Sequence, residues 1–210
     1  MQKLTEQNNK NKDDKVILLN SGGFDSTVLF YDLIRQEKKV LSLFFDYGQN
    51  NKRKEFSCVK RMCKKFGQEF KIIKLPLFDW SNSSVIKKQR GVADEKNEYL
   101  EMRNLVFLSY AVSVAESMGV TKIFMALVKC TYDLKDTSTA FIDIFNSLTT
   151  GACNIEVVTP FNTNTKSELG VISKTLGITK RSYFSCNFPQ RGRPCGVCCK
   201  CTELSKLPHL

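Results

Sequence analysis

The feature that most constrains the fold of this 210-residue chain is an apolar run followed by a glycine-rich loop and a helical segment. Residues 16–19 read Val-Ile-Leu-Leu, which predicts a strand buried on both faces. The loop that follows is Asn20, Ser21, Gly22, Gly23, Phe24, Asp25, Ser26 and Thr27. Glycines let a backbone approach an anion closely, and amides and hydroxyls at a helix N-terminus point donors at phosphate. The unit therefore predicts a phosphate site, although two glycines alone also fit a turn capped by Ser and Asp.

Apolar runs alternate with segments of helical period along the rest of the chain. The expected strands are residues 16–19, 40–45, 70–73, 123–127 and 155–158. The expected helices are residues 27–36, 52–66, 102–118, 141–148 and 165–176, the last opened by a Thr-Lys-Ser-Glu capping box. This alternation predicts an α/β fold, a Rossmann-like parallel sheet with helices on both faces. In such sheets ligands bind beyond the carboxyl ends of the strands.

The role of the nine cysteines depends on whether the protein resides in an oxidising or a reducing compartment. The N-terminus lacks the apolar core of a signal peptide, and no apolar run approaches the roughly 18 residues that span a bilayer. We therefore expect a cytoplasmic protein with no membrane contact. In a reducing compartment, clustered thiols more often hold metal or do chemistry than form disulfides.

Five cysteines fall within residues 186–201, and four of them have the spacing C-x8-C-x2-C-x2-C: Cys186, Cys195, Cys198 and Cys201. Four thiolates around one tetrahedral ion describe a structural Zn²⁺ site. A redox-active Cys-x-x-Cys pair, free buried thiols and an iron–sulfur cluster are the alternatives. The remaining thiols at 58, 63, 130 and 153 are expected to fill the core, and the one at 199 lies beside the ligands.

The formal net charge is +11. Such a charge suits a nucleic-acid surface, an anionic substrate or a solvated lysine-rich exterior. The basic residues are scattered from Lys3 to Lys206, which favours the solvated exterior.

The full string Ser-Gly-Gly-x-Asp-Ser after an apolar strand resembles the PP-loop of ATP pyrophosphatases, of the adenine nucleotide alpha hydrolase type. It lacks the Gly-Lys-Ser/Thr ending of a Walker loop. The resemblance implies ATP binding by residues 20–27 and cleavage between the α and β phosphates. Asp25 would then help to hold Mg²⁺, Ser21 and Ser26 would donate to the released pyrophosphate, and Lys166 would neutralise its charge. Asp25, Ser26 and Lys166 are thus the catalytic candidates.

Further motifs resemble one family in particular, the 7-cyano-7-deazaguanine synthases (QueC). They are Phe-Asp-Tyr-Gly-Gln at 45–49, Arg-Asn at 103–104, Thr-Lys-Ser-Glu-Leu at 165–169 and Ser-Cys at 185–186, within a similarity spanning residues 15–201. The resemblance implies an ATP-dependent ligase that converts 7-carboxy-7-deazaguanine and ammonia to the nitrile, through an adenylated carboxylate and an amide. It also implies self-association. Asp46 and Arg103 are candidates for nucleotide or substrate contacts, with a surface ion pair or a cap as the alternative for each.

We expect three parts: a polar, disordered tail at residues 1–14, a PP-loop ATP-binding α/β domain at 15–180 and a zinc-binding segment at 181–210.

Three stretches depart from the family pattern. Residues 126–137 do not match the usual Asn-containing stretch leading to Tyr-x-Asp-Cys, although Asp136 is a candidate for the family aspartate. Residues 101–104 read Glu-Met-Arg-Asn instead of Pro-x-Arg-Asn, and Asn187 replaces an aromatic residue. The alternative function is therefore a diverged paralogue that adenylates a 7-deazapurine acid or another carboxylate. Such a paralogue would join the acid to a different amine or to a protein, for example in defence or nucleic-acid modification.

Overall fold

The computed structural model describes residues 14–75, 81, 83–86, 99–129 and 135–207. Five parallel strands form one sheet in the order β3-β2-β1-β4-β5. Their bounds are β1 Lys15–Leu19, β2 Lys39–Asp46, β3 Glu69–Lys74, β4 Lys122–Met125 and β5 Glu156–Val158. This is the strand order of a doubly wound nucleotide-binding fold, with β1 in the centre. The predicted parallel sheet is confirmed.

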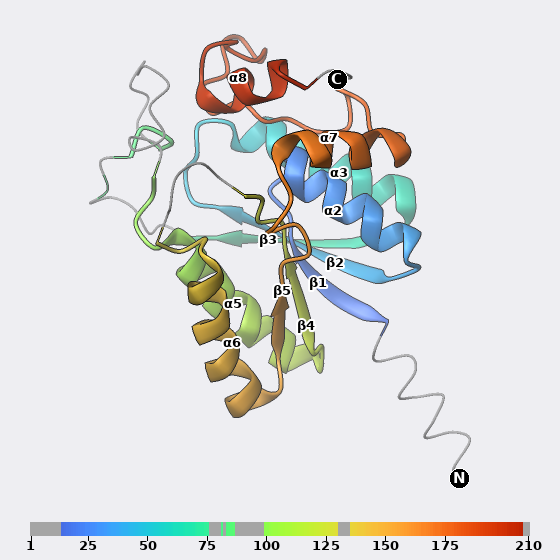
Figure 1. The fold of residues 1–210 in the computed structure, drawn as a ribbon, viewed down its shortest axis with the longest axis vertical. Coiled ribbons are helices and arrows are strands. Elements are labelled where there is room, and N and C mark those ends of the chain that lie inside the picture. The colour runs from blue at the N-terminus through green and yellow to red at the C-terminus, as the bar shows by residue number, and fades with distance from the viewer. Residues whose placement is uncertain (1–13, 76–80, 82, 87–98, 130–134, 208–210) are drawn as a thin grey trace.

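Helices cover both faces of the sheet (Figure 1). On one face lie α2 (Phe24–Arg35), α3 (Lys52–Phe66) and α7 (Lys166–Thr175), and on the other lie α5 (Arg103–Met118) and α6 (Thr139–Cys153). The short helix α8 (Cys199–Ser205) belongs to a C-terminal segment on the side of α2, α3 and α7. The layered arrangement expected from the alternation is therefore present.

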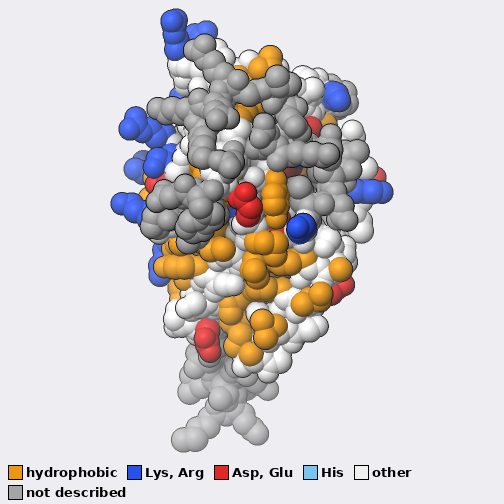
Figure 2. All heavy atoms as spheres, turned by 90° about the vertical axis from the view of Figure 1, so that its left-hand side faces the viewer, with side chains coloured by type: hydrophobic (Ala, Val, Ile, Leu, Met, Phe, Trp, Pro, Cys, Tyr) orange, Lys and Arg blue, Asp and Glu red, His pale blue; other side chains and the backbone are white. Residues whose placement is uncertain are grey.

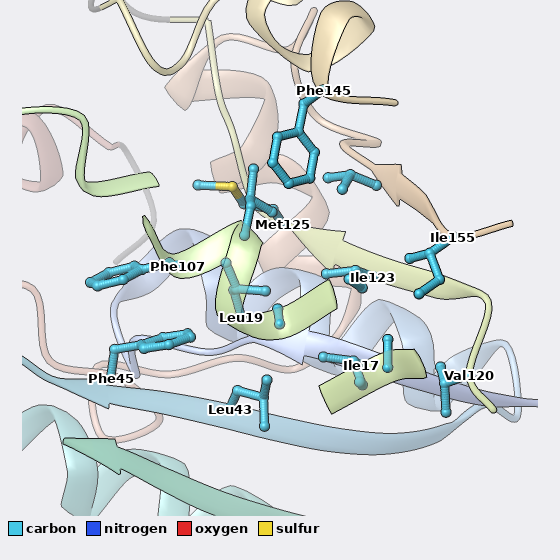
Figure 3. Close-up of a cluster of buried hydrophobic side chains, with 14 of the residues drawn as sticks. Ile17, Leu19, Leu43, Phe45, Phe107, Val120, Ile123, Met125, Phe145 and Ile155 are labelled. Atoms are coloured by element: carbon cyan, nitrogen blue, oxygen red, sulfur yellow. The ribbon is translucent and has the colours of Figure 1, made fainter. Parts of the chain in front are cut away.

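Alternation along β1 divides the core into two clusters. Ile17 and Leu19 join the cluster under α5 and α6, which Figure 3 shows around Leu43 and Ile123. Val16 and Leu18 face the cluster beneath α2, α3 and α7. Successive side chains of a strand point to opposite faces, so a central strand covered twice must be apolar throughout. The run Val-Ile-Leu-Leu meets this requirement.

Several predicted boundaries are confirmed and others need correction. Helix α3 has the predicted bounds and ends at Gly67 in the left-handed conformation, and α7 carries the predicted capping box at Thr165. Helix α2 begins at Phe24 rather than residue 27, α6 extends over Thr139–Cys153 rather than 141–148, and β4 ends at Met125 rather than 127. Helix α6 is longer because the Ser138 hydroxyl accepts from the Phe141 amide at its start.

The carbonyls at the far end of α6 are also satisfied locally, because the Asn154 and Ile155 amides donate to the carbonyls of Thr150 and Thr149 at 3.2 and 3.4 Å. Helix α8 was not predicted. Residues 1–13 of the expected tail and Cys130 lie outside the described residues. Cys58 and Cys63 are buried as expected, and burial raises the pKa of each thiol, which keeps them protonated fillers.

The face formed by α5 and α6 is apolar on its outer side. Figure 2 shows hydrophobic side chains gathered over this part of the surface. The large exposed hydrophobic residues of these two helices are Leu105, Tyr110, Ile144 and Leu148, of which Ile144 is 73% exposed. Within the part of the chain that the structure describes, no helix is both long and apolar enough to cross a membrane.

Candidate functional site

The loop between β1 and α2 lies at the carboxyl end of the central strand. The Asn20 side chain holds its base, because its amide donates to Ser42 Oγ at 3.1 Å and its carbonyl oxygen accepts from the Gly22 amide at 3.0 Å. The hydroxyls of Ser21 and Ser26 lie 3.0 Å apart, and the Gly23 amide donates to Ser21 at 3.2 Å. The loop thus presents two hydroxyls beside a helix N-terminus, the donor set that binds an oxyanion.

Gly22 is needed for packing as well as for conformation. Its φ is +74°, and a Cβ at this position would lie 2.3 Å from the carbonyl oxygen of Glu55 in α3. A side chain there would push the loop away from α3. The loop therefore packs directly on the backbone of α3 at this position, which only glycine allows.

A charged network surrounds Asp25 in the first turn of α2. Both of its carboxylate oxygens accept from Lys166 Nζ, at 2.7 and 2.8 Å, and Glu203 Oε2 of α8 lies 3.6 Å from the same nitrogen. Burial lowers the pKa of Lys200, but the carboxylates of Asp25 and Glu203 outweigh this, so its pKa lies above the ordinary value. Two cations and two carboxylates from α2, α7 and α8 therefore meet beside the loop.

The motif after β2 places a second polar group at the same edge of the sheet. Asp46 ends β2, and both of its carboxylate oxygens lie 3.1 Å from Lys52 Nζ. Arg103 Nη1 donates to the Tyr47 hydroxyl at 3.1 Å, and its guanidinium lies over the rings of Tyr47 and Phe107. Asp46 is thus held in an ion pair, while Arg103 joins the start of α5 to the end of β2.

Glu55 lies between this group and the loop. Its carboxylate accepts from Asn51 Nδ2 at 2.9 Å. Burial raises the pKa of Glu55 to about 8, although hydrogen bonding to Gln49 and the charge of Arg103 act in the opposite direction. A carboxyl that titrates near neutral pH next to a candidate nucleotide loop is typical of functional sites.

The four predicted metal ligands come together. The sulfur atoms of Cys186, Cys195, Cys198 and Cys201 all lie within 4.8 Å of one another. Zn–S bonds of about 2.3 Å in a tetrahedron require sulfurs roughly 4 Å apart, so the cluster fits one ion. Backbone amides donate to Cys186 Sγ at 3.2 Å and to Cys195 Sγ at 3.4 Å, as they do around thiolates.

Hydrogen bonding from Cys186 lowers the pKa of Cys198, which favours the thiolate form that binds metal. The set leaves no open protein position, and bound Zn²⁺ would supply structure rather than chemistry.

The structure brings the loop residues and Lys166 into one site and places Asp46 and Arg103 along its edge. The side chains of Phe24 and Thr27 are buried, and their amides donate to Ser185 Oγ and to the Gly23 carbonyl, so these two residues anchor the loop. Sequence reasoning missed Asn51, Glu55, Lys200 and Glu203 as members of the site. Only tertiary contacts reveal them, since no local motif links α3 or α8 with the loop.

The fold and the loop define a nucleotide-binding α/β protein of the PP-loop class. Solved structures with the same fold include an NH3-dependent NAD synthetase from Campylobacter jejuni subsp. jejuni, with a TM-score of 0.51, 19% identity and coverage of 86% of this chain and 72% of that one. A 4-thiouridine synthetase in complex with RNA and bound ATP has a TM-score of 0.52 and 18% identity, covering 92% of this chain and 49% of that one.

The particular family follows from sequence. The family model for queuosine biosynthesis protein QueC matches residues 15–206, and the chain belongs to this family. A 7-cyano-7-deazaguanine synthase from Leptospira interrogans is 32% identical over 203 residues, covering 90% of this chain and 84% of that protein. Another from Methanoregula boonei is 32% identical over 201 residues, covering 90% and 91%.

Proposed function

We propose that this chain is a 7-cyano-7-deazaguanine synthase, the ATP-dependent ligase that converts 7-carboxy-7-deazaguanine and ammonia to the nitrile. The observation that carries the proposal is the complete loop from Asn20 to Thr27 within a chain of the QueC family. The four-cysteine cluster near the other end of the chain, which suits Zn²⁺, supports it. The reaction requires a carboxylate oxygen, and then the amide oxygen, to become part of a good leaving group, which ATP supplies as AMP.

The roles of the loop residues follow from their positions. The Ser21 and Ser26 hydroxyls would bind the phosphates. The amides of Gly22 and Gly23 already donate to Asn20 and Ser21 and hold the loop in shape. Lys166 would stabilise the charge that develops on pyrophosphate as the carboxylate displaces it from the α-phosphorus. Because Lys166 now lies against Asp25, an incoming phosphate competes with Asp25 for the cation. This exchange would free the Asp25 carboxylate, an oxygen ligand that suits Mg²⁺.

The later steps need positioning more than covalent chemistry. Ammonia replaces AMP at the activated carbonyl to form the amide, and loss of AMP and a proton from the activated amide gives the nitrile. We propose that the deazaguanine ring of the substrate binds near Arg103 and Asp46, at the edge of the sheet beside the loop. Residues 15–180 would carry nucleotide and substrate, and residues 181–210 would hold Zn²⁺.

We also propose that the protein self-associates. The apolar outer face of α5 and α6 (Figure 2) is the surface that supports this, because large exposed apolar patches are typical of protein contacts. A molar mass from light scattering at twice or more the chain mass of 23.9 kDa is the expected result. A monomer at micromolar concentration would contradict it.

A diverged conjugating enzyme is the second candidate, favoured by Asp136. This residue is buried, its carboxylate accepts from the Asn104 amide at 2.8 Å, and its carbonyl accepts from the Asn104 side chain at 3.0 Å. The aspartate therefore fastens the start of α5. In this arrangement the Asp136 carboxylate is not available to accept hydrogen bonds from the purine ring of a substrate.

One incubation separates the two candidates. Purified zinc-loaded protein is mixed with ATP, Mg²⁺, ammonium and 7-carboxy-7-deazaguanine, and pyrophosphate release and product mass are followed. Appearance of the nitrile supports the synthase. Pyrophosphate release that stops at the adenylate or the amide favours the conjugating enzyme, and the absence of any turnover contradicts the synthase.

A further inference from the structure

The N-terminus of α2 is capped by a residue from the other end of the chain. The N-cap residue is Gly23, which has no side chain to accept a hydrogen bond. The first helical amide, that of Phe24, instead donates to Ser185 Oγ at 2.7 Å, across 161 positions of sequence. A Cβ on Gly23 would lie 3.3 Å from the same hydroxyl, so Ser185 is seated directly against the loop.

The two residues before Ser185 also contact the loop. The Phe184 amide donates to the carbonyl of Gly22 at 2.9 Å. The Tyr183 ring packs edge to face on Phe24, with the ring centroids 5.1 Å apart. Three successive residues of this irregular segment thus contact three successive residues of the loop, which fixes the position of Ser185.

The residue after Ser185 is the first metal ligand. Cys186 is fully buried, its sulfur belongs to the four-cysteine cluster, and its carbonyl accepts from Asn51 Nδ2 at 2.9 Å. The same Asn51 nitrogen donates to Glu55, whose backbone forms the wall beside Gly22. A metal that fixes Cys186 therefore also limits where Ser185 can place its hydroxyl.

We propose that Ser185 is a positioning residue of the nucleotide site, through which the metal-bound segment holds the phosphate loop in its binding conformation. The proposal rests on the proposed function only in taking this loop as the nucleotide site. An N-terminal helix amide without an acceptor is costly, and side-chain caps are its usual partners. Here the cap is supplied by the zinc segment, so the loop is ordered only when that segment is in place.

The test compares Ser185→Ala, Ser185→Thr and the control Ser182→Ala. Ser182 lies in the same segment, but its hydroxyl accepts from the amide of Thr179 at 3.2 Å. Two properties of the zinc-loaded proteins are measured: affinity for a non-hydrolysable ATP analogue with Mg²⁺ by calorimetry, and hydrogen exchange of the Phe24 amide. Ser185→Ala should weaken binding about tenfold and speed exchange at least tenfold. Ser185→Thr should restore both, and Ser182→Ala should change neither.

Metal removal gives the second arm. Chelation should weaken nucleotide binding by the natural protein, but add little in Ser185→Ala, because both changes remove the same cap. Equal effects of Ser185→Ala and Ser182→Ala, unchanged Phe24 exchange in Ser185→Ala, or full additivity with chelation would overturn the proposal. If the natural protein binds no nucleotide, the nucleotide assignment fails, and Phe24 exchange still decides whether Ser185 holds the loop.

Discussion

Lys166 Nζ lies 2.7 and 2.8 Å from the two carboxylate oxygens of Asp25, although the residues are 141 positions apart. The pair joins the start of α7 to the start of α2, at the mouth of the glycine-rich loop. Opposite charges held in this way are available for exchange with a polyphosphate and its metal ion. The loop therefore carries a pair of opposite charges at its mouth before the nucleotide arrives.

Replacing Lys166 with Ala should lower the rate of pyrophosphate formation by roughly 10²–10³-fold, because a cation aimed at developing charge is lost. The matched control is Lys122→Ala, which removes an exposed lysine 3.9 Å from Glu156. Exposed ion pairs of this kind contribute little to stability, so the Lys122→Ala protein should form pyrophosphate at the normal rate. A Lys166→Ala enzyme with more than a third of the normal rate would contradict the role given to this residue.

Gly22→Ala should destabilise the protein by about 3 kcal/mol or more, since the Cβ would lie 2.3 Å from a backbone oxygen and φ is +74°. Gly48→Ala is the comparison that isolates the backbone term. Gly48 has a φ of +89°, but a Cβ there would meet nothing within 4 Å, so the cost should be about 1 kcal/mol. Urea unfolding of the two variants measures the difference. Equal losses in the free energy of unfolding would show that the Glu55 backbone does not restrict the space at Gly22.

The raised pKa of Glu55 should make the stability of the protein depend on pH. Burial raises its pKa to about 8, above the ordinary value of 4.5, so between these values the folded state holds a proton that the unfolded state has lost. Its contribution to the free energy of unfolding therefore falls as the pH rises toward 8 and is constant above it. Glu55→Gln cannot ionise and should gain stability over the natural protein as the pH rises from 6 to 9, by about 1–3 kcal/mol.

The control for this prediction is Glu69→Gln. The Glu69 side chain is 70% exposed, 3.9 Å from Lys15, so its removal should give no such trend. Denaturant unfolding at pH 6, 7, 8 and 9 provides the measurement. A stability difference between Glu55→Gln and the natural protein that does not change with pH would show that Glu55 is ionised throughout.

Cys198→Ser should abolish stoichiometric zinc binding, because it removes a buried ligand of the four-sulfur cluster. Cys199→Ser should keep one zinc per chain, since Cys199 is not one of the four clustered ligands. Elemental analysis of both variants makes the comparison. Visible charge-transfer absorption and iron in the natural protein would instead identify an iron–sulfur cluster.

The sequence predicts the strands and the loop well because both signals are local. A run of four apolar residues, two of them β-branched, fits a doubly buried strand, and the glycines and hydroxyls of residues 20–27 are adjacent in the chain. The start of α2 was placed three residues late for the opposite reason. Gly23 carries no cap of its own, and the acceptor for the Phe24 amide is Ser185, which no local pattern relates to it.

The same distinction separates the predicted from the missed site residues. The four clustered cysteines were found because metal ligands repeat at short spacing. Glu55 was missed because its importance comes from the packing of its backbone against Gly22, and Lys200 because the charges of Asp25 and Glu203 act on it only in the folded chain. Sequence reasoning therefore finds the chemistry of a motif, while the electrostatics of the site depend on tertiary packing.

The most direct test of carboxylate adenylation follows oxygen from the acid into AMP. The protein is incubated with ATP, Mg²⁺, ammonium and 7-carboxy-7-deazaguanine carrying ¹⁸O in both carboxyl positions, and the products are analysed by mass spectrometry. Activation of the carboxylate and then of the amide predicts nitrile together with AMP molecules that each carry one ¹⁸O. Unlabelled AMP, or ¹⁸O in inorganic phosphate with formation of ADP, would contradict adenylation at this loop and with it the central claim.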